Sequence, residues 1–383
     1  MDFELTEEQR DLKKAAQKFA EGEFGDSEVA KGYDNEQKFP VGIWGKACDL
    51  GFVGCYIPEE YNGGGLGFLE NALIMEGFTR VDPGVGFLLS TTLGTEVIME
   101  YGTEKQKENY LAPIPAGDAI MGIAITEPDA GSDVAGCTGT RAEKEGDEWI
   151  LKGNKMFTTN GTIADHVLVL AMTDPDADSR HRRQSMFVVE TDWDGFEANK
   201  IEGKAGLRAS DLAELVFNDV KVPEENLVGE RGEGFYETMT FFNRSRTYIG
   251  AQGLGIAQGA LDRALDYVQE REAFGRVISS FQGIRFKLAE METRTQAARN
   301  LVYKAAWELD QGQLERKNVA VAKWYAAETG VKVADEAVQL HGGYGYIDEY
   351  DVERFWRASK AIEIYEGTKE IEKTIVADRL LGK

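Results

Sequence analysis

The sequence predicts a mainly α-helical fold with a central β domain, because three kinds of pattern follow one another along its 383 residues. Apolar residues recur at helical spacing up to about residue 120. Short β-rich segments follow, and long amphipathic patterns fill the remainder. We therefore predict an N-terminal helical domain over 1–120, a central β-sandwich or β-barrel domain over 121–232 and a C-terminal helical bundle domain over 233–383. Strands and helices do not alternate, which argues against a doubly wound nucleotide-binding fold.

The N-terminal part contains a series of helical patterns. Thr6 and Gln9 have the spacing of a capping box before the first helix. Further helices are predicted over 41–50, 69–81 and 95–110. The glycines that follow Tyr61 and Asn62 are interpreted as turn residues rather than as a phosphate-binding loop.

The β domain is predicted from five short runs that are rich in β-branched and aromatic residues. Turn residues separate these runs at a spacing typical of a small sandwich or barrel. Gly153 and Asn154 are predicted to form a turn after the second run. The predicted strands are 122–126, 149–151, 166–170, 185–189 and 215–217.

The C-terminal part is predicted to be a four-helix bundle. Gly253, Gly255 and Gly259 resemble a dinucleotide-binding fingerprint but miss its spacing by one residue. They also lie within a helical pattern, so we interpret them as small residues that allow helices to pack closely. The four predicted helices are 236–270, 280–310, 314–342 and 351–382.

One segment near the end, residues 362–371, breaks the helical pattern by placing Glu366 between Tyr365 and Gly367. A glycine beside a carboxylate lets a ligand approach both the side chain and the backbone N–H. This arrangement suits a general base that also needs an electrostatic partner for a carbonyl oxygen. The alternative interpretation is a surface turn between two helices.

Composition excludes several classes of protein. The net charge of −24 argues against a nucleic-acid partner and against docking on anionic membranes. Three cysteines and three histidines without ligand spacing make a disulfide framework, a metal site or a histidine-based triad improbable. The start of the chain is acidic and lacks the apolar core of a secretory signal, and no apolar run approaches the ~18–20 residues of a membrane span. We expect a soluble cytoplasmic protein without membrane insertion.

Two turns within the β domain offer hydroxyl groups beside backbone donors. The segment Thr126–Asp133 ends a strand and contains Gly131 and Ser132, and the segment Phe157–Gly161 places an aromatic ring beside two threonines. Such turns suit a polar planar ligand that carries phosphates. The basic cluster Arg180–Arg183 is interpreted as a solvated loop, with binding of an anionic ligand's phosphates as the alternative.

Seven motifs that occur in order resemble those of the acyl-CoA dehydrogenase family, over essentially the whole chain. The resemblance implies three domains in the order predicted above, one FAD per subunit, a homotetramer, and electron transfer to an electron-transferring flavoprotein. It also implies α,β-dehydrogenation of an acyl-CoA thioester in fatty acid or carboxylic acid degradation. The motifs are Thr126–Asp133, Lys155–Gly161, Gly206–Ser210, Val220–Pro223, Arg271–Gly275 with Gln282, Gln339–Gly343 and Tyr365–Thr368.

The resemblance also implies the roles of individual residues. Glu366 is the base that removes the α-proton, while the alternative family position, here Ser245, carries no carboxylate; this favours the short- and medium-chain arrangement. Substrate contacts are implied for Ser132, Asn243, Arg246 and Gly367. FAD contacts are implied for Ile123, Thr126, Gly131, Ser132, Phe157, Thr158, Thr159, Thr368 and Glu370. Contacts to the FAD of an adjacent subunit are implied for Arg271, Phe274, Gln282, Gln339, Gly342 and Gly343.

The acyl group is predicted to be short, branched or alicyclic. Residues 84–93 match a segment in which glutaryl-type relatives carry an arginine, and here the segment has no charge. Two alternatives stay open: an acyl-CoA oxidase, which usually has an extra C-terminal domain, and a flavin-bearing protein that binds a partner without catalysis.

Overall fold

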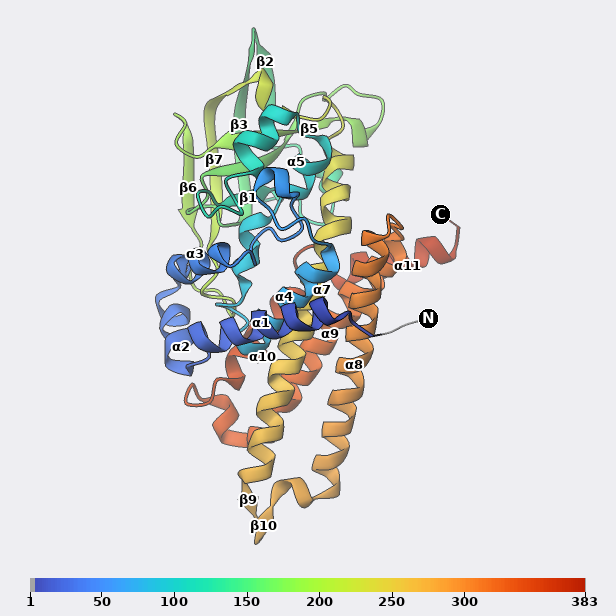
Figure 1. Ribbon diagram of the computed structural model, residues 1–383. Coiled ribbons are helices and arrows are strands. Elements are labelled where there is room, and N and C mark those ends of the chain that lie inside the picture. Colours follow the sequence, from blue (N-terminus) through green and yellow to red (C-terminus); the bar gives the residue numbers. More distant parts are fainter. Residues whose placement is uncertain (1–3, 383) are drawn as a thin grey trace.

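A computed structural model describes residues 4–382, which form the predicted succession of helices, sheet and helices. Figure 1 shows the sheet at one end of an elongated molecule and, at the other, the small hairpin of β9 (Glu272–Ala273) and β10 (Arg276–Val277). The long helix α7 (Gly234–Glu270) joins the two ends. The ends of the two predicted outer domains, residues 1–3 and 383, lie outside the described residues. None of the helices within 4–382 is long and apolar enough to cross a membrane.

The N-terminal helices begin as predicted, with the Thr6 hydroxyl accepting from Gln9 N and the Gln9 side chain accepting from Thr6 N. The prediction of one helix over 95–110 is wrong. It divides at Gly102, because Thr103 caps a new helical start with its own capping box. The elements are α1 (Glu7–Phe24), α2 (Ser27–Glu36), α3 (Val41–Asp49), α4 (Phe68–Val81), the 3₁₀ helix η2 (Phe87–Thr92), α5 (Thr95–Tyr101), α6 (Glu104–Gln106) and a π-helical turn η3 (Lys107–Leu111).

The central sheet has the strand order β6-β7-β3-β2-β4-β5-β8, and β1 pairs with β4 in parallel. All five predicted strands are present. Three others were not predicted, because β2 and β6 are charged and mostly exposed and β8 has only two residues. The strands are β1 (Met121–Ala124), β2 (Arg141–Glu145), β3 (Glu148–Thr159), β4 (His166–Met172), β5 (Gln184–Glu190), β6 (Phe196–Lys200), β7 (Leu212–Pro223) and β8 (Leu227–Val228).

The predicted turn at Gly153 and Asn154 is wrong, because both residues lie inside β3 and pair with β7. Gly153 has a φ of +136° and sits at a shift of the β3–β7 register. A Cβ there would lie 2.6 Å from the Cα of Thr140. Glycine is therefore required by a bulge and a close backbone approach inside the strand, not by a hairpin turn.

The C-terminal helices pack closely against α4. A Cβ at Gly255 would lie 2.1 Å from Thr79 Oγ1, and one at Gly259 would lie 2.2 Å from the carbonyl oxygen of Arg80. These glycines therefore serve helix packing, as predicted. The single helix predicted over 351–382 is in fact two, separated by the turn that contains Glu366. The elements are α7 (Gly234–Glu270), β9 (Glu272–Ala273), β10 (Arg276–Val277), α8 (Gln282–Asp310), α9 (Arg316–His341), α10 (Val352–Ile362) and α11 (Lys369–Leu380).

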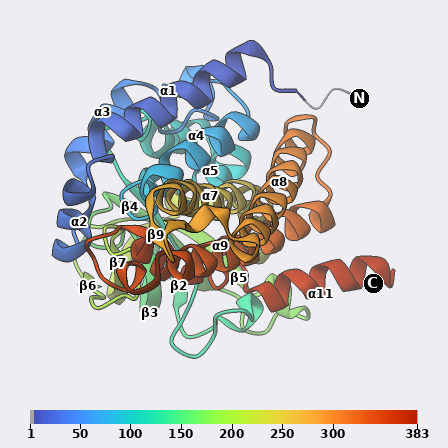
Figure 2. The same ribbon diagram turned by 90° about the horizontal axis from the view of Figure 1, so that it is seen from below.

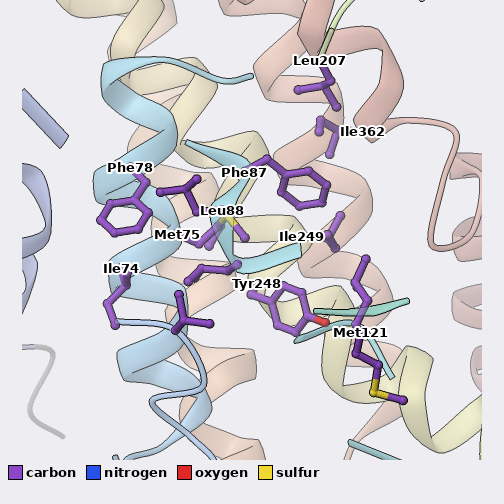
Figure 3. Packing of buried hydrophobic residues seen from close by; sticks show 14 of the residues in the cluster. Ile74, Met75, Phe78, Phe87, Leu88, Met121, Leu207, Tyr248, Ile249 and Ile362 are labelled. Atoms are coloured by element: carbon purple, nitrogen blue, oxygen red, sulfur yellow. The ribbon is translucent and has the colours of Figure 1, made fainter. Parts of the chain in front are cut away.

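The core around α7 joins all three parts of the chain. Seen from below in Figure 2, α7 lies in the middle of the molecule, α1 and α3 lie on one side of it, and α11 projects toward the periphery. Figure 3 shows apolar side chains of α4, η2 and α7 packed together, among them Met75, Leu88 and Ile249. This packing holds η2 between the helical core and the sheet.

Candidate functional site

The turn between α10 and α11 presents Glu366 in a backbone conformation that few side chains adopt. Its φ is +55°, and the φ of the following Gly367 is +97°. The Thr368 side chain then accepts from Ile371 N and starts α11. Left-handed backbone at a non-glycine residue is held only when its surroundings enforce it. The contacts of this turn therefore identify what fixes Glu366.

The Glu366 carboxylate is half-buried and accepts a hydrogen bond from Ser245 Oγ on α7, which lies 2.7 Å from Oε2. Burial raises the pKa of Glu366 to about 7, while the Ser245 hydroxyl and the charges of Arg246 and Lys323 act to lower that pKa. A carboxyl group with a pKa near neutrality can take up and release a proton at working pH.

Two cationic side chains donate hydrogen bonds to the backbone carbonyl oxygens of the turn. Arg246 Nε donates to the carbonyl oxygen of Glu366 over 2.9 Å, and Lys323 Nζ donates to the carbonyl oxygens of Tyr365 and Gly367 over 2.7 and 2.6 Å. Arg246 Nε also lies 2.9 Å from Glu372 Oε1. Sequence analysis marked Arg246 but missed Lys323 and Glu372. Nothing in a helical pattern distinguishes a buried lysine of α9 or a buried glutamate of α11 before the helices are packed.

The 3₁₀ helix η2 connects this turn with the sheet. The ring centroids of Phe87 and Tyr365 are 6.2 Å apart, and the side-chain amide of Asn160 donates to the carbonyl oxygen of Ser90 over 2.8 Å. Every residue of η2 is buried. Thr159, directly before Asn160 in the chain, is thereby brought to the same region as Glu366.

A second buried carboxylate, Glu96 of α5, belongs to this region and was also missed. It accepts a hydrogen bond from the Tyr248 hydroxyl over 2.9 Å. Burial is the main cause that raises the pKa of Glu96 to about 7, and the charge of Glu366 adds to the rise. The charge of Glu366 therefore disfavours ionisation of Glu96.

The sheet presents unpartnered hydroxyls beside an exposed aromatic ring. Met156 N donates to the carbonyl oxygen of Thr126 over 2.8 Å, which places the end of β1 beside β3. The hydroxyls of Thr126 and Thr159 are partly exposed and make no hydrogen bond within the described residues. A register shift after Lys155 gives Phe157 a φ of +57° and leaves its side chain 60% exposed. Hydroxyl donors and an aromatic face fit a planar heteroaromatic group such as the flavin ring of FAD.

The remaining predicted residues of the sheet have different surroundings. Ile123 is half-buried on β1, and Gly131 and Ser132 are exposed in the turn that follows. Thr158 is buried, and its hydroxyl has no hydrogen-bond partner among residues 4–382. On α7, Asn243 is buried beside the Arg244–Arg246 segment.

The other predicted cofactor residues lie elsewhere. Arg271, Gly342 and Gly343 line a cavity of about 410 Å³ together with Tyr267 and His341. Phe274, in the β9–β10 hairpin, is 96% exposed, and Gln282 and Gln339 are exposed on α8 and α9. The hairpin lies at the opposite end of the molecule from the sheet (Figure 1). Within a single chain these residues therefore do not lie near Glu366. Thr368 and Glu370, in contrast, follow Glu366 closely in the sequence.

The basic cluster Arg180–Arg183 forms a short 3₁₀ turn on the surface of the β domain. Arg180 Nη2 donates to both carboxylate oxygens of Asp133, and Arg182 pairs with Glu233. Both arginines remain about half exposed. The structure thus agrees with a surface loop in which Arg180 and Arg182 are paired within the chain, whereas Arg183 Nε is buried and has no hydrogen-bond partner among the described residues. No group of His, Cys, Asp and Glu side chains within 4–382 could hold a metal ion.

Three family models match the chain in succession. They describe the acyl-CoA dehydrogenase N-terminal domain over residues 6–118, the middle domain over 122–220 and the C-terminal domain over 232–381. Together they span most of the sequence, in the same order as the helical, sheet and helical parts.

Individual proteins match over the full length. A short-chain specific acyl-CoA dehydrogenase of Clostridium acetobutylicum is 40% identical over 382 residues, covering 99% of this chain and 100% of the relative. An acryloyl-CoA reductase (NADH) of Anaerotignum propionicum is 40% identical, covering 100% of this chain and 97% of the relative. A chain in a solved structure named for the electron transferring flavoprotein of Acidaminococcus fermentans is 41% identical, with a TM-score of 0.96 and complete coverage of both chains.

Proposed function

Because this chain belongs to the acyl-CoA dehydrogenase family, we propose that it oxidises the α,β carbon–carbon bond of a short-chain acyl-CoA thioester. The product is the corresponding 2-enoyl-CoA. The observation that carries the proposal is Glu366, a half-buried carboxylate that is fixed by Ser245 and has a pKa of about 7.

Glu366 acts as the general base in this proposal. The proton α to the thioester carbonyl is weakly acidic, so its removal needs a carboxylate close by and a donor for the charge that develops on the carbonyl oxygen. The backbone N–H of Glu366 donates to no group within the described residues, which leaves it available to that oxygen. One residue thus offers both the base and a donor for the oxyanion, with Gly367 leaving room for the substrate.

FAD is the cofactor of this family, and the residues present fit it. Thr126, Thr158, Thr159 and Phe157 would hold the flavin ring, with Ile123, Gly131, Ser132, Thr368 and Glu370 as further contacts. When bound, FAD supplies the acceptor for the hydride that leaves the β-carbon. The exposed set of Arg271, Phe274, Gln282, Gln339, Gly342 and Gly343 would contact the FAD of an adjacent subunit in a homotetramer.

The acyl chain is proposed to bind between η2, α5 and α7. The segment η2 is uncharged and combines apolar side chains with hydroxyls, since Phe87, Leu88 and Leu89 are followed by Ser90, Thr91 and Thr92, all of them buried. A short straight, branched or alicyclic chain suits this setting, and the similarity to a short-chain specific relative supports it. Ser132, Asn243 and Arg246 would contact the substrate along the route to Glu366.

An electron-transferring flavoprotein is the proposed electron acceptor. The similarity to a chain in a structure named for such a flavoprotein supports this choice. We place the reaction in the cytoplasm, in degradation of fatty or other carboxylic acids.

Anaerobic titration of the purified yellow protein with butyryl-CoA, isobutyryl-CoA and a cyclic acyl-CoA tests the proposal. We expect at least one thioester to bleach the flavin absorbance. Glu366→Gln should keep its FAD and lose the bleaching, whereas Glu143→Gln, which removes an exposed charge on β2, should bleach normally. Retention of bleaching by Glu366→Gln would refute the assignment of the base. Rapid peroxide formation without an added acceptor would instead identify an oxidase.

A second candidate is the reverse reaction, reduction of a 2-enoyl-CoA. The similarity to an acryloyl-CoA reductase (NADH) favours testing it. Under anaerobic conditions, chemically reduced protein is mixed with crotonyl-CoA or acryloyl-CoA. Net turnover with an electron donor, in excess of turnover in the oxidative direction, would assign the chain to reduction.

A further inference from the structure

A buried cluster of charges lies beneath the turn between α10 and α11. Three different helices supply it: Arg246 comes from α7, Lys323 from α9 and Glu372 from α11. Arg246 is 5% exposed, and Lys323 and Glu372 are fully buried. Burying charges is costly unless they are paired and hydrogen-bonded. Their partners therefore show what the cluster does.

The two cations of the cluster hold three successive backbone carbonyls. Lys323 Nζ donates to Tyr365 O and Gly367 O, over 2.7 and 2.6 Å, and Arg246 Nε donates to Glu366 O over 2.9 Å. The peptide groups on both sides of Glu366 are thus fixed from one direction. This pins the left-handed backbone of Glu366, which then directs its carboxylate toward Ser245.

Glu372 supplies the opposite charge. Its Oε1 lies 2.9 Å from Arg246 Nε, although neither carboxylate oxygen receives a well-aligned hydrogen bond within the described residues. The contact is therefore an ion pair rather than a directed hydrogen bond. Gly367 has no side chain to intervene, since a Cβ there would lie 2.1 Å from Glu372 Oε1. The Glu372 carboxylate therefore lies against the backbone of Gly367.

We propose that Lys323 and Glu372 are positioning residues for Glu366: Lys323 holds the carbonyls of the turn, and Glu372 balances the two cations so that Glu366 remains a competent base. The inference rests on the proposed role of Glu366. The charged and titratable groups around Glu366 are Arg246 and Tyr248 of α7, Glu96 of α5, Lys323 of α9, Tyr365 of the turn itself and Glu372 of α11.

The sign of the Glu372 effect follows from charge alone. Arg246 and Lys323 both act to lower the pKa of Glu366. Burial raises the pKa of Glu372 to about 7, while Arg246 and Lys323 act to lower it, so Glu372 carries its charge from about that pH upward. Removal of this charge leaves the two cations less neutralised and removes a like charge near Glu366. Both changes favour the ionised form of Glu366, which makes it a weaker base. Glu372→Gln is isosteric, so a purely structural role of Glu372 would not produce this change.

Infrared spectroscopy across a pH titration tests the inference without turnover. The protonated carboxyl band that disappears in Glu366→Gln reports Glu366. In Glu372→Gln, its midpoint should fall by about 1 pH unit, the low end of the effect of one nearby charge. Glu143→Gln, on the exposed side of β2, is the matched control and should leave the midpoint in place. An unmoved midpoint in Glu372→Gln would overturn the inference.

The same proteins are then mixed with butyryl-CoA in a stopped-flow instrument. If the midpoint shifts but no acyl-CoA reduces the flavin of the wild type, the positioning inference stands and the proposed function fails. If butyryl-CoA reduces the flavin of the wild type normally and the midpoint does not move in Glu372→Gln, the positioning inference fails and the proposed function stands. The two failures are therefore distinguishable.

Lys323→Met tests the carbonyl contacts, because it keeps the length of the side chain and removes its donors. We expect flavin reduction to slow about 100-fold, the loss that a small misplacement of a reacting group produces. FAD content should be unchanged, because no proposed contact to the flavin ring is altered. A rate within threefold of the wild type would refute the role of Lys323. Should Lys323→Met be poorly folded, Lys323→Gln, whose side-chain amide can still donate to one of the two carbonyls, should fold and slow flavin reduction by more than about threefold; a rate closer to that of the wild type would again refute the role of Lys323.

Discussion

Removal of the Ser245 hydroxyl should move the pH dependence of flavin reduction to higher pH. Ser245 Oγ lies 2.7 Å from Glu366 Oε2 and donates to it. This hydrogen bond stabilises the ionised carboxylate, and it is the largest cause that lowers the pKa of Glu366 against the effect of burial. In Ser245→Ala the lowering contribution is lost while burial remains, so the pKa of Glu366 rises above its value of about 7.

The magnitude follows from the strength of the contact. A hydrogen bond to a charged group contributes roughly 1.5–3 kcal/mol, and one pKa unit corresponds to about 1.36 kcal/mol, so the expected rise is about 1–2 units. Since the proposed base acts in its ionised form, reduction accelerates as pH rises through this pKa. The ionised share at pH 7 then falls from about one half to between about 10% and 1%, and the rate falls about 5- to 50-fold.

The assay is anaerobic stopped-flow reduction with butyryl-CoA between pH 6 and 10, using only proteins with full FAD content. The wild type should show an ascending limb with a midpoint near 7, and Ser245→Ala one near 8–9 that approaches the wild-type rate at the alkaline end. Thr247→Ala is the matched control. Its hydroxyl, on the same turn of α7, donates to the Arg244 carbonyl oxygen instead of to Glu366. A uniform loss of rate at every pH, without a shifted limb, would refute the reasoning.

Three further outcomes are expected. Phe157→Ala should weaken FAD binding about 2- to 10-fold, from an aromatic contact of about 0.5–1.5 kcal/mol, and Phe157→Trp should not; equal dissociation constants by fluorescence titration would contradict this. Gly367→Ala should abolish flavin reduction and lower the melting temperature, because its Cβ would lie 2.1 Å from Glu372 Oε1 at a φ of +97°; a fully active variant would contradict the clash. Glu237 is buried without a side-chain hydrogen-bond partner within residues 4–382, and its pKa is raised to about 8, mainly by burial. Above about pH 4.3 the Glu237 carboxyl is ionised in the unfolded chain but stays protonated in the folded protein. The free energy of unfolding therefore falls as pH rises toward 8. Glu237→Gln should raise the unfolding free energy at pH 8 by up to about 5 kcal/mol and have little effect at pH 4. Denaturant melts at both pH values check this, with the exposed Glu143→Gln as control, and equal gains at both would contradict it.

Local pattern was sufficient for the order of helices and strands, because periodicity reports which face of each element is buried. Local pattern failed to predict elements whose type cannot be read from which residues are buried. β2 and β6 carry charged, exposed residues, so they have no apolar alternation to detect. Gly153 resembled a turn residue because its sequence does not tell whether a glycine ends a strand or bulges within it.

By itself the sequence determined the central feature, a carboxylate at Glu366 beside a glycine, together with a hydroxyl-bearing β domain and a strongly acidic composition. Only the tertiary structure decided how that carboxylate is held. Ser245 lies 121 residues before Glu366 and Lys323 lies 42 residues before Tyr365, and they meet the turn only after α7 and α9 have packed. Tertiary structure also separated the surface set around Arg271 and Gly342 from the Glu366 region. Contacts between distant segments depend on how whole helices pack, and no local pattern of residues records them.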